Sequence, residues 1–117
     1  VVLVPLTGIL TLESINNIDQ DIFDYVAANP HSECMIIDFT GIDVSDFDYI
    51  DLHTLTERFE KLNKTLSLMG IRVLHSGMNP DVVHHFITTG YSFPSESFPS
   101  FRTALQQLVR DGYKQAF

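Results

Sequence analysis

The sequence is poor in three features, each of which would point to a particular class of protein. Its single cysteine, Cys34, excludes an internal disulfide and suits a reducing compartment. No apolar run approaches the roughly 20 residues that a membrane span needs. The opening VVLVPLTG has neither an initiator methionine nor a basic stretch, so we expect part of a longer protein without a secretory signal. These absences predict a cytoplasmic protein that does not insert into a membrane.

Basic residues are also scarce. Seven Lys and Arg stand against 15 Asp and Glu, which gives a formal net charge of -8. That balance repels phosphate backbones and anionic lipid surfaces, so we expect no nucleic acid partner. The length of 117 residues and a hydrophobic fraction of 44% predict one domain over residues 1–117 that folds without disulfides or metal. Residues 113–117 are expected to form a frayed tail.

Strand-like and helix-like segments alternate along the chain. Two short strands are expected at 1–6 and 9–12, and Pro5 favours a sheet edge for the first. The run from Cys34 to Ile37 is continuously apolar, which is typical of a strand buried on both faces. We predict an α/β fold with a single sheet of four to five mixed, mostly parallel strands and about four helices. The other expected elements are a helix from Glu13 to Asn29, a loop at 38–49, a helix from Leu52 to Gly70, a strand at 71–74, a turn at 77–80, a helix ending at Gly90, a loop with a short strand at 91–98, and a helix after Ser100.

An acidic loop follows the buried strand. An EF-hand is excluded, because the third ligand position after Asp46 and Asp48 is Ile50 and no glycine follows. A looser Mg²⁺ site, a solvated loop whose acids favour the start of the next helix, and a partner-recognition loop all stay open. The carboxylates concerned are Asp38, Asp43, Asp46, Asp48 and Asp51.

Other chemistry has little support in the sequence. The histidines form no HxxxH or HExxH pair, so we expect no zinc site and surface or half-buried positions. Nucleophile and phosphate-loop motifs are absent, and the thiol of Cys34 is expected to be buried and unreactive. We therefore predict no cofactor and no enzymatic activity. The histidines are His31, His53, His75, His84 and His85.

Three stretches together carry a resemblance to a known family: 4–10, then 35–42 with 49–52, then 70–82. In this order they resemble a STAS domain. That fold occurs in anti-sigma factor antagonists, in stressosome scaffold proteins and in the cytosolic tails of sulfate-permease-type transporters. The resemblance implies a non-catalytic protein-interaction module in bacterial regulatory signalling. The implied partners are a related STAS protein or an anti-sigma or switch kinase, with a homo-oligomer as a further possibility.

The chain departs from this family at the phosphorylation sites. A partner kinase of such domains phosphorylates a Ser or Thr directly after a loop aspartate. Counting back from the end of the helix matches that aspartate to Asp51 and the acceptor to Leu52. Counting forward from Asp38 matches the acceptor to Phe47 instead, so the loop is several residues longer. A second acceptor position, in the helix after the turn, falls on His85.

None of these positions carries a hydroxyl, so the resemblance implies a binding module whose phospho-switch has been lost. The alternatives are the cytosolic STAS domain of a sulfate-permease-type anion transporter and a small metal or nucleotide binder that uses the acidic loop. Fallback acceptors are Ser45, Thr54 and Thr56. The predicted binding residues are Asp43, Ser45, Asp46, Phe47, Asp48, Asp51, Leu52 and His53 in the loop and helix start, with Gly77, Asn79, Pro80 and His85 at the second turn.

Overall fold

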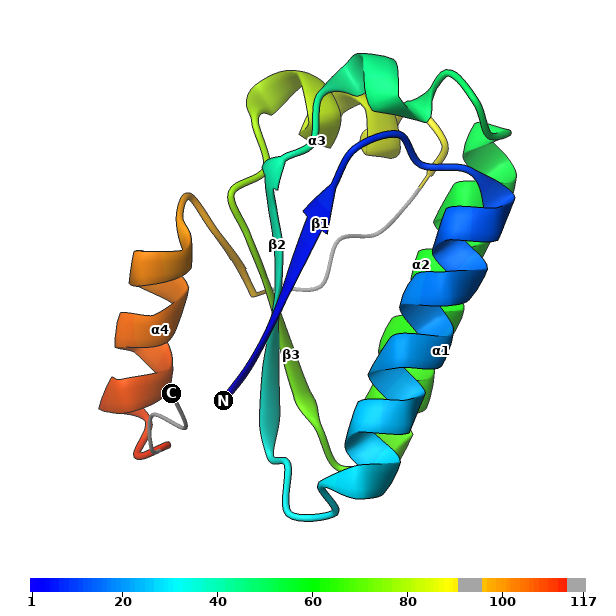
Figure 1. Ribbon diagram of the computed structural model, residues 1–117. Helices are drawn as coiled ribbons and strands as arrows, with labels where there is room; N and C mark the ends of the chain where they lie inside the picture. The colour runs from blue at the N-terminus through cyan, green and yellow to red at the C-terminus, as the bar shows by residue number, and fades with distance from the viewer. Residues whose placement is uncertain (91–95, 114–117) are drawn as a thin grey trace.

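The computed structural model describes residues 1–90 and 96–113 (Figure 1). No helix in these ranges is both long and apolar enough to cross a membrane. The elements are β1 (Val2–Thr7), α1 (Leu12–Ala28), β2 (Cys34–Gly41), the 3₁₀ helix η1 (Val44–Phe47), α2 (Leu52–Leu68), β3 (Arg72–Ser76), α3 (Pro80–Ile87), β4 (Ser97–Phe98) and α4 (Phe101–Arg110).

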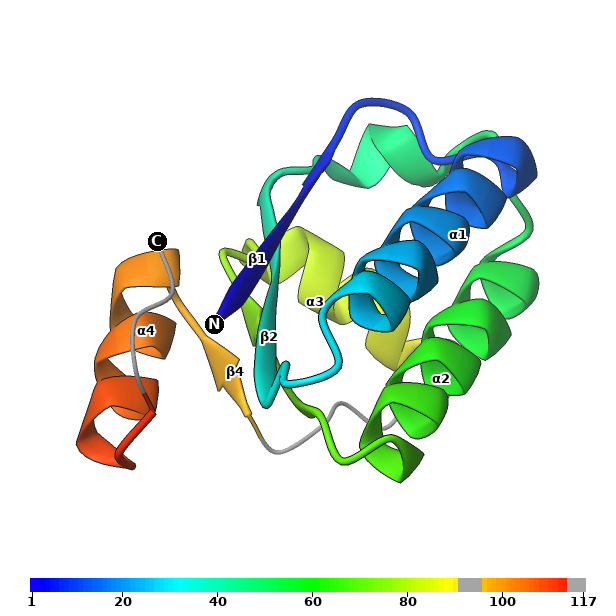
Figure 2. The ribbon, with the colours of Figure 1, turned by 60° about the horizontal axis from the view of Figure 1, so that its bottom comes forward.

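The four strands form one sheet in the order β1-β2-β3-β4, and all three pairings are parallel. Helices α1 and α2 cover one face and α4 covers the other, while α3 and η1 lie beyond the carboxyl ends of the strands (Figures 1 and 2). The predicted α/β fold is therefore confirmed. The described strands narrow the expected four to five mixed strands to four parallel ones.

The central strand β2 holds the two halves of the core together. Met35 and Ile37 point into the larger cluster beneath α1 and α2, whereas Cys34 and Ile36 point into the smaller cluster beneath α4. All four side chains are at most 2% exposed. The continuous apolar run therefore marks a strand that is covered on both faces, as predicted.

The predicted second strand at 9–12 is wrong. Gly8 turns the chain with a φ of 77°, and Thr11 already caps helix α1. The Thr11 hydroxyl accepts from the Ser14 amide at 3.1 Å, and the Ser14 hydroxyl accepts from the Thr11 amide at 2.8 Å. This reciprocal cap satisfies two amides that a short strand would have needed to pair elsewhere. The position of β1 at the sheet edge agrees with the expectation from Pro5.

The loop predicted to begin at Asp38 begins later, because β2 continues to Gly41. Asp38 pairs with Ser76 of β3, and Gly41 pairs with Thr7 of β1. Backbone pairing on both sides thus extends the strand through residues whose polarity suggested a loop. Part of the remaining loop is the 3₁₀ helix η1.

The later helices follow the predictions closely. Helix α2 ends just before Gly70, whose φ is 79°, and α4 begins directly after its N-cap Ser100. The short strand expected within 91–98 is β4, at the end of that range. Residues 91–95 of the predicted loop and 114–117 of the predicted tail lie outside the described residues.

Candidate functional site

Two rings bring the predicted loop and the predicted second turn together. The ring of Phe47, from η1, stacks on that of His85, from α3, with centroids 5.5 Å apart and planes inclined by 11°. Phe47 is 3% exposed and also meets Phe86 edge-on at 5.3 Å. The loop after β2 and the helix after β3 therefore form one surface. Two of the positions matched to phospho-acceptors are occupied by rings packed against each other.

The start of α2 is held by Asp51. Its carboxylate accepts from the Thr54 amide at 3.0 Å and from the Thr54 hydroxyl at 3.1 Å. These hydrogen bonds hold the pKa of the exposed Asp51 carboxyl below its usual range. Leu52, the first residue of the helix, is half-buried, and His53 is exposed. Asp51 thus serves as the cap that the helix start requires.

The 3₁₀ helix η1 is fixed from two sides. Its Asp46 carboxylate accepts from the Asp43 amide at 2.8 Å, and its Asp46 carbonyl accepts from the Leu10 amide at 3.0 Å. The second bond ties the loop after β1 to the loop after β2. Asp43 and Asp48 remain exposed on this surface, whereas Asp46 is half-buried.

The second turn is tightly fitted. Asn79 caps α3 by accepting from the Val82 amide at 2.9 Å, and Pro80 occupies the first helical position. Gly77 has a φ of 72°, and a Cβ there would lie 2.2 Å from Thr40 Oγ1 and 2.9 Å from Asp38 Oδ1. Only glycine fits this turn without displacing its neighbours.

Sequence reasoning missed a polar network beneath that turn. Asp38 Oδ1 accepts from Ser76 Oγ at 2.6 Å and from Thr40 Oγ1 at 3.0 Å. Ser76 is fully buried and Asp38 half-buried, so Asp38 belongs to the sheet and not to a solvated loop. One signal was available: polar residues end two strands that the fold places side by side.

The expectation for the histidines fails at one position. His75 is 1% exposed and lies beside Phe39, with ring centroids 5.9 Å apart. Among residues 1–90 and 96–113, neither ring nitrogen of His75 has a hydrogen-bond partner. Burial lowers the pKa of His75 to about 4, so the side chain is neutral at physiological pH.

The fallback acceptors differ in access. Ser45 is exposed on η1, and the Thr54 hydroxyl donates to the cap Asp51. Thr56 is 6% exposed, donates to the Leu52 carbonyl at 2.8 Å and lies 3.0 Å from the Thr89 hydroxyl. A kinase would therefore reach Ser45 directly but could reach Thr56 only after the helix opens.

These segments together form what we call the acidic end: residues 8–12, 42–53 and 77–87 at the carboxyl ends of the strands (Figure 1). It contains five aspartates and not one Lys or Arg. Four large apolar side chains on it are between 50% and 64% exposed: Ile9, Leu12, Tyr49 and Ile87. The four described strands follow one another in order, so their order does not reverse at any point between them, and such a reversal is where open α/β sheets usually form a ligand crevice. The acidic end therefore combines exposed apolar side chains with carboxylates.

Metal binding finds no support in the geometry. Within residues 1–90 and 96–113, no three His, Cys, Asp or Glu side chains are placed to hold a metal ion. His85 stacks on Phe47, while His84 is exposed. The two adjacent histidines therefore do not converge.

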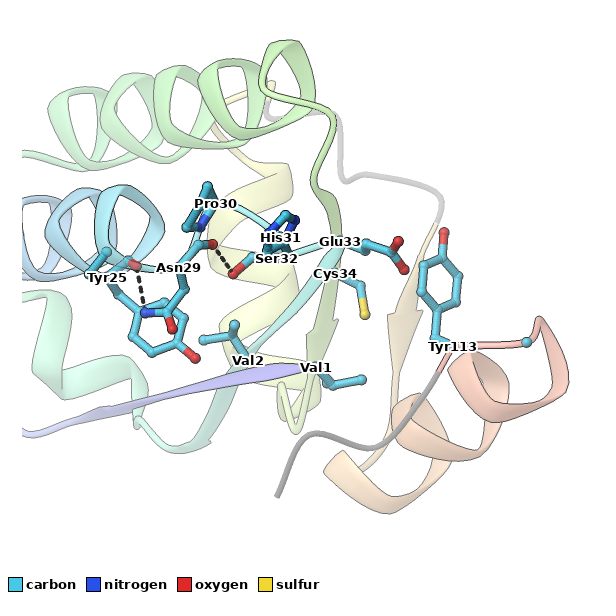
Figure 3. Close-up of a pocket in the computed structure, with 12 residues that line it drawn as sticks. Val1, Val2, Tyr25, Asn29, Pro30, His31, Ser32, Glu33, Cys34 and Tyr113 are labelled. Atoms are coloured by element: carbon cyan, nitrogen blue, oxygen red, sulfur yellow. Dashed lines mark hydrogen bonds between the residues drawn. The ribbon is translucent and has the colours of Figure 1, made fainter.

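A cavity of about 610 Å³ lies at the opposite, amino end of the strands (Figure 3). The polar groups of its turn bond to one another: the Asn29 side chain donates to the Tyr25 carbonyl at 2.9 Å, and Ser32 donates to the Asn29 carbonyl at 2.8 Å. Cys34 lines it but is 2% exposed, and burial raises the pKa of its thiol. The cysteine is thus buried and protonated, as an unreactive thiol should be.

Comparisons with known proteins identify the fold. No protein-family model matches the sequence. The structure is similar to a Ser-to-Glu variant of RsbS from Moorella thermoacetica, with a TM-score of 0.71 and 14% identity over 92% of this chain and 86% of that one. It is also similar to the STAS domain of a SulP transporter from Vibrio cholerae, with a TM-score of 0.62 and 19% identity over 94% of this chain and 81% of that one. The chain therefore has the STAS fold, as its sequence resemblance implied.

One curated protein is similar in sequence. The uncharacterized protein YezB of Bacillus subtilis (strain 168) is 27% identical over 75 residues, which make up 63% of this chain and 70% of YezB.

Proposed function

We propose that this chain is a non-catalytic regulatory module that binds a partner protein through its acidic end in the bacterial cytoplasm, without a phospho-switch there. The stacked pair of Phe47 and His85 carries the proposal. A phosphate would add nearly two negative charges and three acceptor oxygens. Neither ring carries the hydroxyl that a Ser/Thr kinase phosphorylates, and the half-buried Leu52 has none either.

The surface around this pair has what a protein interface needs. Exposed Tyr49, Ile9 and Leu12 offer apolar area, and aromatic anchors are enriched at such interfaces. The surrounding carboxylates select a partner with basic groups and repel acidic ones. A related STAS protein or a switch kinase is the kind of partner we propose. The likeness to RsbS supports the fold on which this rests.

A second candidate is the regulatory tail of a sulfate-permease-type anion transporter. The observation that favours it is the likeness to the SulP transporter STAS domain, at a TM-score of 0.62. The full-length gene distinguishes the two: about a dozen apolar spans before this domain would indicate a transporter, and a sensor domain would indicate signalling.

Affinity capture from an extract of the source organism tests the binding surface. We expect Tyr49→Ala, which truncates a side chain that is 64% exposed, to lose most of the captured partner. Leu68→Ala is the matched control, because Leu68 is 81% exposed but lies at the far end of α2. If both variants lose the captured partner equally, or if neither loses it, the proposed surface is contradicted.

Intact-mass measurement tests the missing switch. We expect no stoichiometric phosphate after incubation with the captured kinase or with a fresh cell extract and ATP. If phosphate is found, Ser45 is the fallback acceptor most accessible to a kinase. Loss of that phosphate in Ser45→Ala would identify Ser45 as its site. Stoichiometric phosphate on Ser45, Thr54 or Thr56 would overturn this part of the proposal while leaving the binding surface intact.

A further inference from the structure

Helix α4 carries exposed positive charge beside apolar side chains, whereas the acidic end carries negative charge beside apolar side chains. Its inner face, with Ala104 and Leu108, is fully buried against the sheet. Its outer side holds a groove lined by Arg102, Leu105, Gln106, Val109 and Arg110. At 100° per residue, these five side chains fall within one stripe, which we call the α4 stripe.

The α4 stripe is available for contact. Val109 is 47% exposed, and Arg102, Gln106 and Arg110 are also exposed. The two arginines are separated by about 12 Å along the helix axis. Neither takes part in the three ion pairs found among the described residues, which join Arg58 to Asp19 and Arg72 to Glu96 and Asp111. The stripe therefore presents an apolar centre between two exposed cations that form no ion pair with any described residue.

The acidic end of the same chain has the complementary pattern. It places exposed Tyr49 among aspartates such as Asp43 and Asp48 and contains no Lys or Arg. We propose that the α4 stripe of one copy docks on the acidic end of a second copy. Opposite charges at the rim would fix the orientation, and the apolar centres would be buried between them.

The position of the two surfaces determines the type of assembly. Helix α4 lies on one face of the sheet, whereas the acidic end lies beyond the carboxyl ends of the strands (Figures 1 and 2). Two different surfaces therefore meet, which makes the contact heterologous, and a pair of copies keeps one α4 stripe and one acidic end free. The contact repeats into a ring or a chain. It also competes with the partner proposed above for the acidic end.

The net charge of -8 opposes association but does not prevent it. At physiological ionic strength the Debye length is about 8 Å, so carboxylates far from the contact are largely screened. Pairs in direct contact are screened much less. We therefore expect association at 0.15 M NaCl that weakens at 0.5 M.

Charge reversal with purified protein tests the contact by sedimentation equilibrium. We expect Arg102→Glu with Arg110→Glu to reduce the association constant at least tenfold, and Asp43→Lys with Asp48→Lys to do the same. An equimolar mixture of the two variants pairs an acidic end with an intact α4 stripe and a reversed end with a reversed stripe. We expect that mixture to regain association close to that of the wild type.

A wild-type protein that stays monomeric at millimolar concentration would overturn the proposal. A mixture that fails to associate would also overturn it, provided that cooperative melting shows both variants to be folded. If a reversed variant unfolds, the neutral pairs R102Q with R110Q and D43N with D48N replace it, each with a loss expected. The arginine variant keeps the acidic end, so it retains partner capture if the proposed function holds. Failure of self-association is thereby distinguished from failure of the proposed function.

Discussion

The two ends of the sheet are built on different principles. At the carboxyl end, β2 and β3 finish in a partly buried hydrogen-bond network in which Asp38 accepts from the exposed Thr40 and the buried Ser76, and Gly77 closes over it with no space for a side chain. At the amino end, β2 begins with the buried Cys34, whereas β3 begins with Arg72, which closes this end through half-buried ion pairs.

The two ends therefore differ in how much displacement of their side chains and backbone they tolerate. Buried, directed hydrogen bonds and close backbone contacts tolerate little displacement, because an unpaired buried group or a clash costs several kcal/mol. Ion pairs near solvent can be replaced by water at little cost. We therefore expect the carboxyl end, which carries the candidate site, to be the more sensitive of the two to small changes.

The most severe change is Gly77→Ala. It adds a Cβ that would lie 2.2 Å from Thr40 Oγ1, at a φ of 72° that alanine adopts poorly. We expect a loss of about 4 kcal/mol in the free energy of unfolding, from backbone strain and overpacking together. Urea denaturation measures it.

Gly90→Ala is the control for this change. Gly90 has a φ of 77°, and among the described residues no heavy atom outside its chain neighbours lies within 4 Å of its Cβ position, so a loss of only about 1 kcal/mol is expected. The double variant Gly77→Ala with Thr40→Ala should recover part of the larger loss, because it removes the nearest atom. Equal losses at Gly77 and Gly90 would show that the carboxyl end is not tightly fitted.

His75 gives the same end a dependence on pH. Burial lowers its pKa to about 4, against about 6.5 in an unfolded chain, so between these values the unfolded state binds the extra proton. Stability therefore falls as pH falls from 6.5 to 4, by about 3 kcal/mol from this group. Urea titrations of wild type and His75→Leu at pH 7 and pH 4 measure the difference.

We expect His75→Leu to lose this part of the pH dependence and to be as stable as the wild type at pH 7, since two unpaired buried nitrogens are removed. His53→Leu is the matched control, because His53 is exposed. A His75→Leu protein whose stability declines between pH 7 and pH 4 as steeply as that of the wild type would refute this account.

The sequence determined the regular elements well where local signals agreed. Helix α2 could be predicted because its apolar spacing and a stop at Gly70 agree on where it runs, and the structure adds Asp51 as its N-cap. The start of β2 was equally clear from its continuous apolar run. Such features depend on neighbours in the sequence, so they can be predicted without knowing the fold.

The carboxyl end could not be predicted to the same degree, because it depends on contacts between distant residues. Asp38 belongs to a strand because it pairs with Pro5 of β1 and with Ser76 of β3, which are 33 residues earlier and 38 residues later in the chain. The stack of Phe47 on His85 likewise spans 38 residues: both were named as site residues, but nothing local indicates that they touch. His75 was expected at the surface or half-buried, and the strand predicted at 71–74 left it outside, whereas β3 continues through His75 to Ser76.

The smallest effect is expected at the amino end, from Arg72→Met. Arg72 binds Glu96 and Asp111, and its guanidinium lies 5.6 Å from the Tyr113 ring centroid, so it links β3 to the segment before β4 and to the end of α4. Its side chain is 23% exposed, and methionine keeps much of the apolar stem contact. We expect a loss of about 1 kcal/mol by urea denaturation at pH 7.

If the ion pairs cause the loss of stability in Arg72→Met, that loss must depend on pH and on salt concentration. Arg72 lowers the pKa of the Asp111 carboxyl, so the ion pair stabilises the fold above the carboxyl pKa and ceases to do so as pH falls through it. The difference between wild type and Arg72→Met should therefore shrink at pH 3 and in 0.5 M NaCl, whereas Arg72→Lys should be less destabilising at pH 7. A loss as large as that of Gly77→Ala, unchanged by acid or salt, would mean that the amino end is fitted as tightly as the carboxyl end.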